Sequence, residues 1–341
     1  QTMSMHYNLN KKANVWVGTF KETAVYDDNG NCINKTTSYW DMKTRNWIEM
    51  SREDSKYDEY GRQIEYDSRQ WNIERACWLG LERKSYTFSD KGLMTSFKDY
   101  TWNEAKGIWE NTLLDQYEYN TEGQKTLEVH SKWQNNEWKK LTRTEYQYDA
   151  STHAPTSEVL YNSENGEWIP ESETTYIYKV ATATENATKT KHLRLYDKTG
   201  KTWVDIEEYI STIDAQGAEI ALKRREFKDN KWYVTKDERN TLQYDEHGNE
   251  TFNEKTQWIG GNEWTGRSRN ETQYNEQGDV AMERETTWDL NTNDWKGMKF
   301  IEYEYDADGY VIKEKHYRWD PKINDWKNMS IMEYEYDENH N

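Results

Sequence analysis

The chain has 341 residues, of which 34% are hydrophobic and 32% charged, and its formal net charge is −18. This acidity repels phosphate backbones and anionic lipid, and no stretch approaches the roughly 18 consecutive apolar residues of a membrane span, so neither nucleic acid nor membrane insertion is expected. With few aliphatic residues, the 18 Trp, 26 Tyr and 6 Phe must supply most of the buried surface.

Turn glycines recur along the chain at intervals of 30 or 31 residues wherever they are consecutive. They are Gly30, Gly61, Gly92, Gly123, Gly217, Gly248, Gly278 and Gly309. Most follow Tyr-x-Tyr-Asp or a variant, as in "YEYDADG" at 303–309. A fixed period of this length is typical of repeat proteins, so we predict about eleven tandem units in a single repeat domain, 1–341.

The units are regular over 1–150 and 187–341 and irregular over 151–186, where the Gly turn is replaced and a connection lengthens. A local function would be sought first in this interruption, although drift in loop sequence also explains it.

Each unit carries Trp at two positions, about ten and about seventeen residues after its glycine. All 18 Trp fall at these positions, with Trp16 in an incomplete first unit and with Phe227, Tyr161 and Tyr196 as substitutes for the first Trp. The spacing therefore marks two structurally equivalent places in every unit.

Each unit is predicted to be one β-hairpin. In the last unit, 311–319 and 326–337 are rich in strand formers and lack a helical apolar period, and "DPKIND" between them is typical of a turn. The fold class is therefore all-β, with about eleven ~31-residue hairpins in a long antiparallel meander. Because neighbouring strands twist, we expect this sheet to coil into a superhelix or a curved open shell.

Alternation along a strand predicts one aromatic and one charged face. The predicted aromatic sets are Trp326, Met332, Tyr334 and Tyr336, and Trp295, Ile301, Tyr303 and Tyr305. The predicted charged sets are Lys327, Glu333 and Glu335, and Lys296, Glu302 and Glu304. Equivalent rings of successive hairpins should form columns. The same register places Cys32 and Cys77 too far apart for a disulfide, so both should be free thiols.

No motif indicates catalysis. The seven His form no His-x-x-x-His pair, and nucleophile-elbow, phosphate-loop and dinucleotide motifs are missing from the sequence. The Asp-rich turns resemble fragments of calcium loops but lack the distal Glu. We therefore expect a protein that is not an enzyme and has no cofactor and no metal.

The aromatic rings are the remaining candidates for function. Stacked Trp and Tyr can hold the apolar faces of sugars, whereas the alternative is that these rings serve as the protein's own core. The candidate binding residues are Trp40, Trp47, Trp102, Trp109, Trp288, Trp295, Trp319, Trp326, Tyr305 and Tyr336.

The Tyr-x-Tyr-Asp-x-x-Gly phrase, seen at 303–309 and approximately at 242–248, resembles the YD repeat of bacterial Rhs-type toxin shells and of teneurins. The longer unit with two Trp is similar to YD-like repeat proteins secreted by Bacteroidetes. Here the unit has about 31 residues rather than about twenty, and the Rhs-type autoproteolytic core has no recognisable counterpart. The resemblance implies export and a structural or binding role.

Three functions follow as expectations. The leading one is a secreted or cell-surface, non-catalytic repeat protein that presents an aromatic sheet face to a glycan or a protein. The second is a structural shell or spacer without a tight ligand, and the third is a polysaccharide hydrolase with its site in 151–186. The start at Gln1 fits a chain whose signal peptide has been removed, hence an extracellular or cell-envelope location.

Overall fold

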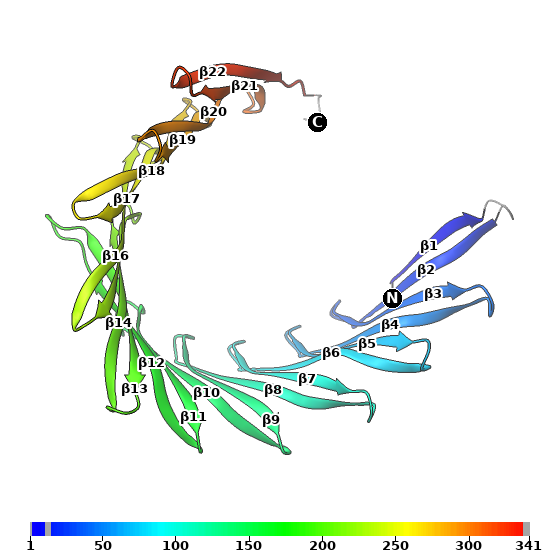
Figure 1. Ribbon diagram of the computed structural model, residues 1–341. Helices are drawn as coiled ribbons and strands as arrows, with labels where there is room; N and C mark the ends of the chain where they lie inside the picture. Colours follow the sequence, from blue (N-terminus) through cyan, green and yellow to red (C-terminus); the bar gives the residue numbers. More distant parts are fainter. Residues whose placement is uncertain (1, 11–14, 337–341) are drawn as a thin grey trace. The chain divides into compact units, whose positions relative to one another are not determined.

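The computed structural model describes residues 2–10 and 15–336, and within these ranges the chain forms twenty-two β-strands and no helix (Figure 1). No helix of the described part is long and apolar enough to cross a membrane. The chain divides into two compact units, Gln1–Glu173 and Thr174–Asn341, which are described separately below.

The first unit contains the strands β1 to β11, and β12 (Glu167–Lys179) runs through the boundary. The strands are β1 (Thr2–Asn10), β2 (Val15–Tyr26), β3 (Cys32–Asp41), β4 (Asn46–Tyr57), β5 (Gln63–Asn72), β6 (Cys77–Phe88), β7 (Met94–Asn103), β8 (Ile108–Tyr119), β9 (Lys125–Gln134), β10 (Glu137–Tyr148) and β11 (Pro155–Glu164).

The second unit contains the strands β13 to β22. They are β13 (Ala187–Asp197), β14 (Thr202–Ile213), β15 (Glu219–Lys228), β16 (Lys231–Tyr244), β17 (Glu250–Gly260), β18 (Glu263–Tyr274), β19 (Val280–Asp289), β20 (Asp294–Tyr305), β21 (Val311–Asp320) and β22 (Asp325–Glu333).

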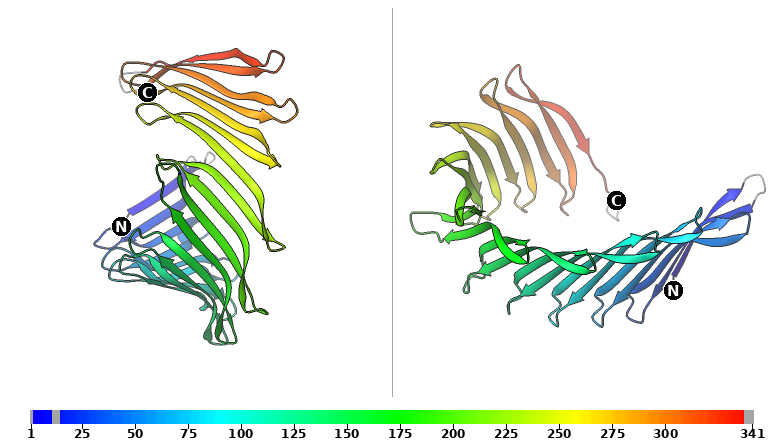
Figure 2. Two further views of the ribbon diagram at one scale, coloured as in Figure 1. Left: turned by 90° about the vertical axis from the view of Figure 1, so that its left-hand side faces the viewer. Right: turned by 60° about the horizontal axis from the view of Figure 1, so that its bottom comes forward.

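Within each unit every strand pairs antiparallel with the next strand of the chain. The pairing runs without interruption from β1 to β11 and from β13 to β22. Figure 2 shows the hairpins of each unit side by side, with the twist expected of paired strands. The predicted all-β meander of hairpins is confirmed.

The turns between repeats use the chemistry that the sequence predicts. Asp58 Oδ1 accepts hydrogen bonds from the backbone N–H groups of Tyr60 (2.9 Å) and Arg62 (3.0 Å), which closes an Asx turn. Gly61 follows with φ of 77°, a conformation that a side chain disfavours. The same arrangement recurs at Asp214 and Asp306, so the Asp-x-x-Gly phrase encodes a turn.

A β-bulge breaks the strand alternation in every hairpin whose register is described. The extra residue always lies three positions after the second Trp of the ~31-residue repeat. These residues are Thr19, Met50, Leu81, Thr112, Leu141, Ile206, Thr235, Arg267, Met298 and Met329. One extra residue exchanges the two faces for all positions that follow it.

The predicted division into an aromatic and a charged face is therefore wrong. Opposite residues of paired strands share a face, and in β20 the register puts Trp295 opposite Trp288 and, after the bulge, Glu302 opposite Met282. One face of β20 thus carries Trp295, Phe300, Glu302 and Glu304, and the other carries Lys296, Lys299, Ile301, Tyr303 and Tyr305. We call these the Trp face and the Tyr face.

The last hairpin shows the same exchange. Trp326 lies opposite Trp319, whereas Met332 lies opposite Glu314 on the other face. The hydroxyl of Tyr334 donates to Met332 Sδ at 3.4 Å, so Tyr334 accompanies Met332 rather than Trp326. Glu333, predicted on the charged face, shares the face of Trp326.

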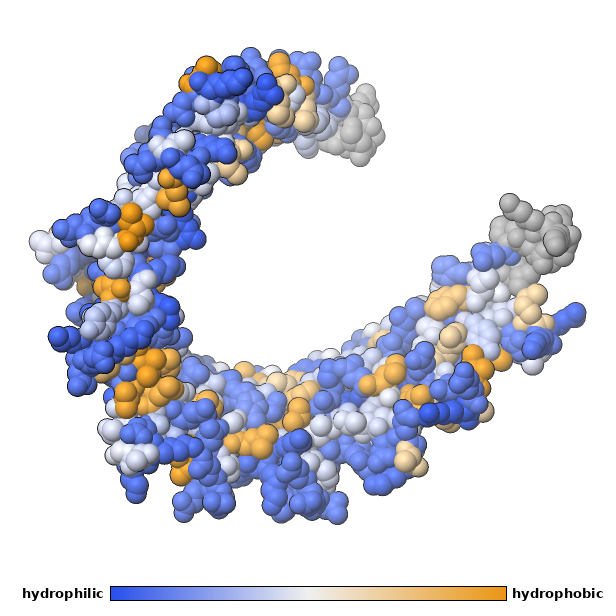
Figure 3. All heavy atoms as spheres, viewed as in Figure 1, coloured by the Kyte–Doolittle hydropathy of each residue, from blue (hydrophilic) through white to orange (hydrophobic). Residues whose placement is uncertain are grey.

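The chain forms a single layer of sheet. Its accessible surface is 23,045 Å², whereas a compact globular chain of 41.1 kDa would expose about 14,700 Å². Among the described residues only Ala24, Leu114 and Met282 are buried apolar side chains. In Figure 3 apolar residues form small separate patches on the visible surface. Lateral contacts between rings on the sheet therefore replace a conventional core. The free state predicted for Cys32 and Cys77 is confirmed.

Candidate functional site

The two Trp of a hairpin meet directly across the paired strands, next to the hairpin turn. Trp319 and Trp326 have ring centroids 5.3 Å apart and planes at 80°, an edge-to-face arrangement. The other candidate pairs have the same geometry: Trp40–Trp47 at 5.4 Å, Trp102–Trp109 at 5.2 Å and Trp288–Trp295 at 5.2 Å. Every Trp whose side chain is described is half-buried. Trp16 lies in β2, outside the residues whose side chains are described.

Glycines of the neighbouring hairpin lie against several Trp pairs. A Cβ added to Gly297 in β20 would lie 2.5 Å from Cζ2 of Trp326 and 2.6 Å from Cε3 of Trp319. Gly80 and Gly266, at the equivalent place two residues after the second Trp, are covered in the same way. The missing side chain lets the indoles settle onto the sheet.

Cations lie over some of the indoles. Arg269 lies 4.2 Å from the ring centroid of Trp295, and Arg69 lies 5.7 Å from that of Trp102. Lys21 takes the same place over Trp47 at 5.5 Å. Such contacts hold a ring face that a ligand would otherwise use.

Among the candidates, no described cation covers Trp40, Trp109, Trp288, Trp319 or Trp326, so their ring faces are not held by a charged side chain of the described residues. The Trp–Trp contacts within 2–10 and 15–336 all join the two strands of one hairpin, so discrete pairs replace the predicted continuous columns.

The two tyrosine candidates lie away from the Trp pairs. Tyr305 donates its hydroxyl to the carbonyl of Val280 at 2.7 Å, and Tyr336 donates to that of Val311 at 2.8 Å. Equivalent bonds join Tyr57 to Cys32 and Tyr119 to Met94. The second Tyr of each phrase thus fastens the end of its hairpin's second strand to the start of the first strand of the same hairpin.

The ten candidate residues therefore separate into two sets. The Trp pairs lie by the hairpin turns on the Trp face, and Tyr305 lies by the Gly turn on the Tyr face. Ten residues of strand, roughly 33 Å, separate Trp295 from Tyr305 along β20. The structure does not bring the two sets together.

The irregular stretch keeps the turn chemistry of the regular repeats. Asp149 Oδ1 accepts from the backbone N–H of Ser151 (3.0 Å) and of Thr152 (2.8 Å), and His153 adopts φ of 58° in place of glycine. The Ser151 hydroxyl, together with further donors of this turn, holds the pKa of Asp149 well below its ordinary value. These contacts describe a variant turn and assemble no catalytic arrangement.

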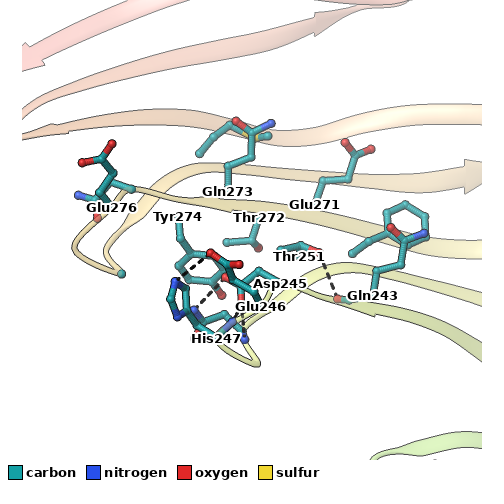
Figure 4. Close-up of a pocket in the computed structure, with 15 residues that line it drawn as sticks. Gln243, Asp245, Glu246, His247, Thr251, Glu271, Thr272, Gln273, Tyr274 and Glu276 are labelled. Atoms are coloured by element: carbon teal, nitrogen blue, oxygen red, sulfur yellow. Dashed lines mark hydrogen bonds and ion pairs between the residues drawn. The ribbon is translucent and has the colours of Figure 1, made fainter.

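Grooves between successive Gly turns are a feature that sequence reasoning missed. Groove A, of about 640 Å³, lies in the first unit between the turns at Ser89 and Asn120. Groove B, of about 780 Å³, lies in the second unit between the turns at Asp245 and Asn275 (Figure 4). Groove C, of about 600 Å³, follows it, between the turns at Asn275 and Asp306.

The Tyr-x-Tyr positions line all three grooves. They are Tyr117 and Tyr119 in groove A, Thr272 and Tyr274 in groove B, and Tyr303 and Tyr305 in groove C. Groove B is the largest of the three and has Thr272 where the other two have a tyrosine. In Figure 4 Tyr274 points toward the turn formed by Asp245, Glu246 and His247. Partial burial, together with the nearby carboxylates of Asp115 and Glu128, raises the pKa of Tyr117 to about 12.

Acidic groups dominate grooves B and C. Groove B has Asp245, Glu246, Glu271 and Glu276, and groove C has Asp279, Asp306 and Asp308, while neither is lined by Lys or Arg. The side-chain amide of Asn249 lowers the pKa of Asp245, so this carboxylate is charged at neutral pH. In the described part of the chain, no three His, Cys, Asp or Glu side chains are placed to hold a metal ion.

Comparison with known proteins found no matching family model and no matching curated protein. Solved structures with similar hairpins include a DUF3836 family protein from Bacteroides vulgatus ATCC 8482, which is 20% identical, with 28% of this chain and 91% of that chain covered and a TM-score of 0.22. A porin-like protein from Bacteroides uniformis ATCC 8492 is 11% identical, with 73% and 92% covered and a TM-score of 0.30. The complex TcdB2-TccC3-TEV is 12% identical, with 89% and 20% covered and a TM-score of 0.29. Likenesses this low do not place the chain in a family.

Proposed function

We propose that this chain is a non-catalytic protein of the cell surface or the extracellular space that presents its Trp pairs to a polymeric partner, with a glycan as the first candidate. The observation that carries the proposal is the half-buried Trp pair, repeated along one face of a single-layer sheet. Aromatic side chains that remain partly accessible on one face of a sheet form a candidate binding surface.

The geometry favours a polymer over a small ligand. Successive Trp pairs are two strands apart, which at 4.7–4.9 Å per strand is about 9.6 Å. A ligand that uses several pairs must therefore extend across the strands. Each pair offers indole surface on which the apolar side of a sugar can stack.

The last hairpin is the first one to test. Trp319 and Trp326 have no described cation over them, and Trp326 is supported from the side by Phe300 at 5.4 Å. By contrast, Arg269 occupies the face of Trp295, so that ring requires displacement of the guanidinium before a sugar can stack.

Acrylamide quenching of Trp fluorescence, with and without a panel of soluble polysaccharides, tests the proposal. One polysaccharide should suppress quenching, and Trp319→Ala should weaken its binding more than Trp295→Ala, which serves as the matched control. If no polysaccharide changes the quenching and a surface-protein extract also leaves it unchanged, the rings serve as the protein's own core and the chain is a structural spacer.

A further inference from the structure

The turns of the first unit are bridged by their own side chains. Arg62, the residue after Gly61, reaches the next turn, where its Nη1 lies 3.4 Å from the carbonyl oxygen of Ser89. Its guanidinium lies 4.8 Å from the ring centroid of Phe88. A Cβ added to Gly92 would lie 3.2 Å from Nη1 of Arg62. A cation of the chain thus fills this gap between turns.

Other gaps of the first unit are bridged in related ways, although groove A remains open beside one of these bridges. Lys91 Nζ donates to the carbonyl of Thr121 at 2.7 Å, and a Cβ added to Gly123 would lie 3.6 Å from Cδ1 of Leu93. Gln124 Nε2 donates to the carbonyl of His153 at 2.7 Å. Each of these side chains comes from one turn and contacts the next.

Grooves B and C of the second unit have no such bridge. The positions equivalent to Arg62 hold Asn249 in groove B and Asp279 in groove C, and both side chains bond within their own turns. Nothing lies within 4 Å of a Cβ added to Gly278 or Gly309, so the space that Arg62 fills in the first unit is open here.

The groups that contact the Arg62 guanidinium in the first unit nevertheless have counterparts in grooves B and C. Tyr274 and Tyr305 stand where Phe88 stands, and the turn residues Asn275 and Asp306 stand where Ser89 stands. The acidic lining described above adds negative charge, and the exposed carboxylates of Glu276 and Asp308 have no described partner. A guanidinium or ammonium group from outside would find an aromatic ring, a carbonyl oxygen and carboxylates.

The distance between the grooves also restricts which conformation a partner segment can have. Grooves B and C are successive, so their centres are two strand spacings apart, about 9.6 Å. A polyproline II helix advances about 9.3 Å in each turn of three residues. A basic residue at every third position of such a helix would therefore meet successive grooves.

We propose that grooves B and C bind a basic, proline-rich segment of a partner protein in polyproline II conformation, one cationic side chain in each groove. Aromatic grooves that recognise this preformed helix are a recurrent mode of peptide recognition. The site is separate from the Trp pairs, which lie at the other end of the same strands.

The test measures fluorescence anisotropy of labelled peptides with the full chain. An (Arg-Pro-Pro)4 peptide should bind, (Glu-Pro-Pro)4 should not, and (Arg-Pro)6, whose arginines do not match the groove spacing, should bind about tenfold more weakly.

Two substitutions that copy the first unit, Asn249→Arg and Asp279→Arg, place an internal cation in each groove. Together they should weaken (Arg-Pro-Pro)4 binding at least about tenfold. Asn31→Arg, the same change at the equivalent position of the first unit, lies outside grooves B and C and should leave it unchanged. Circular dichroism confirms that each variant is folded.

Equal binding of both arginine peptides would overturn the proposal in favour of unspecific charge attraction. Unchanged binding by the double variant would also overturn it, as would a glucosamine oligomer that binds at these grooves when the peptide does not. The Trp-pair proposal is tested separately, because Trp319→Ala should not affect peptide binding.

Discussion

Gly297 offers a sharp test of the Trp packing, through the substitution Gly297→Ala. The added Cβ would lie 2.5–2.6 Å from ring atoms of Trp326 and Trp319, whereas carbon atoms prefer about 3.5–4.0 Å. The indoles must therefore retreat by about 1 Å. Overfilling a packed site costs about 1–3 kcal/mol, while Ala in place of Gly in a strand otherwise gains about 0.5–1 kcal/mol. The expected net effect is a loss of about 1 kcal/mol in the free energy of unfolding.

Urea unfolding followed by Trp fluorescence measures this loss, and near-ultraviolet circular dichroism reports the altered Trp pair. Asn328, the equivalent residue of the next hairpin, is exposed and serves as control, since Asn328→Ala should change stability by less than about 0.5 kcal/mol. The direction in which Gly297→Ala shifts the urea midpoint tests the packing. If Gly297→Ala raises the urea midpoint, the indoles do not rest on this glycine and the packing described here is wrong.

Three further outcomes are expected. Tyr305→Phe removes the hydrogen bond to the Val280 carbonyl and should cost about 0.5–1.5 kcal/mol in urea unfolding; an unchanged midpoint would show that the bond contributes nothing. The Asn249 amide depresses the pKa of Asp245 below its ordinary 3.8, so stability from this turn is present above that pH and lost as the pH falls further; Asp245→Asn should flatten the pH dependence of the urea midpoint as the pH falls from about 5 toward about 2. Arg269→Met uncovers the indole beneath it and should increase acrylamide quenching, and equal quenching would contradict the cation–π contact.

The period and the hairpins could be predicted because their signals are local. Asp58 and Gly61 indicate a turn because Asp accepts backbone hydrogen bonds and Gly adopts a positive φ, and both effects act within a few residues. The spacing of the two Trp likewise identified two equivalent positions in each repeat, whereas their pairing across the hairpin, as in Trp319 and Trp326, is seen only in the structure.

The faces could not be predicted because the bulge has no residue signature. Its extra residue is Thr112 in one hairpin, Arg267 in another and Met329 in the last. An extra residue of any type exchanges the faces, so alternation counted along the sequence fails at the point where it is most needed.

The grooves could not be predicted for a different reason. Whether a gap is filled depends on the residue after the turn glycine, such as Arg62 or Asp279, reaching a turn about thirty residues away. Only the spacing of strands in the sheet reveals that these residues face a neighbouring turn. The sequence shows the repeat period, but it does not show which side chains of one repeat contact the next repeat.

The restriction of strand contacts to chain neighbours also bears on mechanical behaviour. Within a unit, nearly all strand contacts join consecutive strands, so a hairpin can detach without disturbing distant ones. Under tension, each detached repeat of about 31 residues would release roughly 100 Å of chain. Such a molecule would unfold in steps of similar length under force and dissipate energy at each step, instead of unfolding completely at one force.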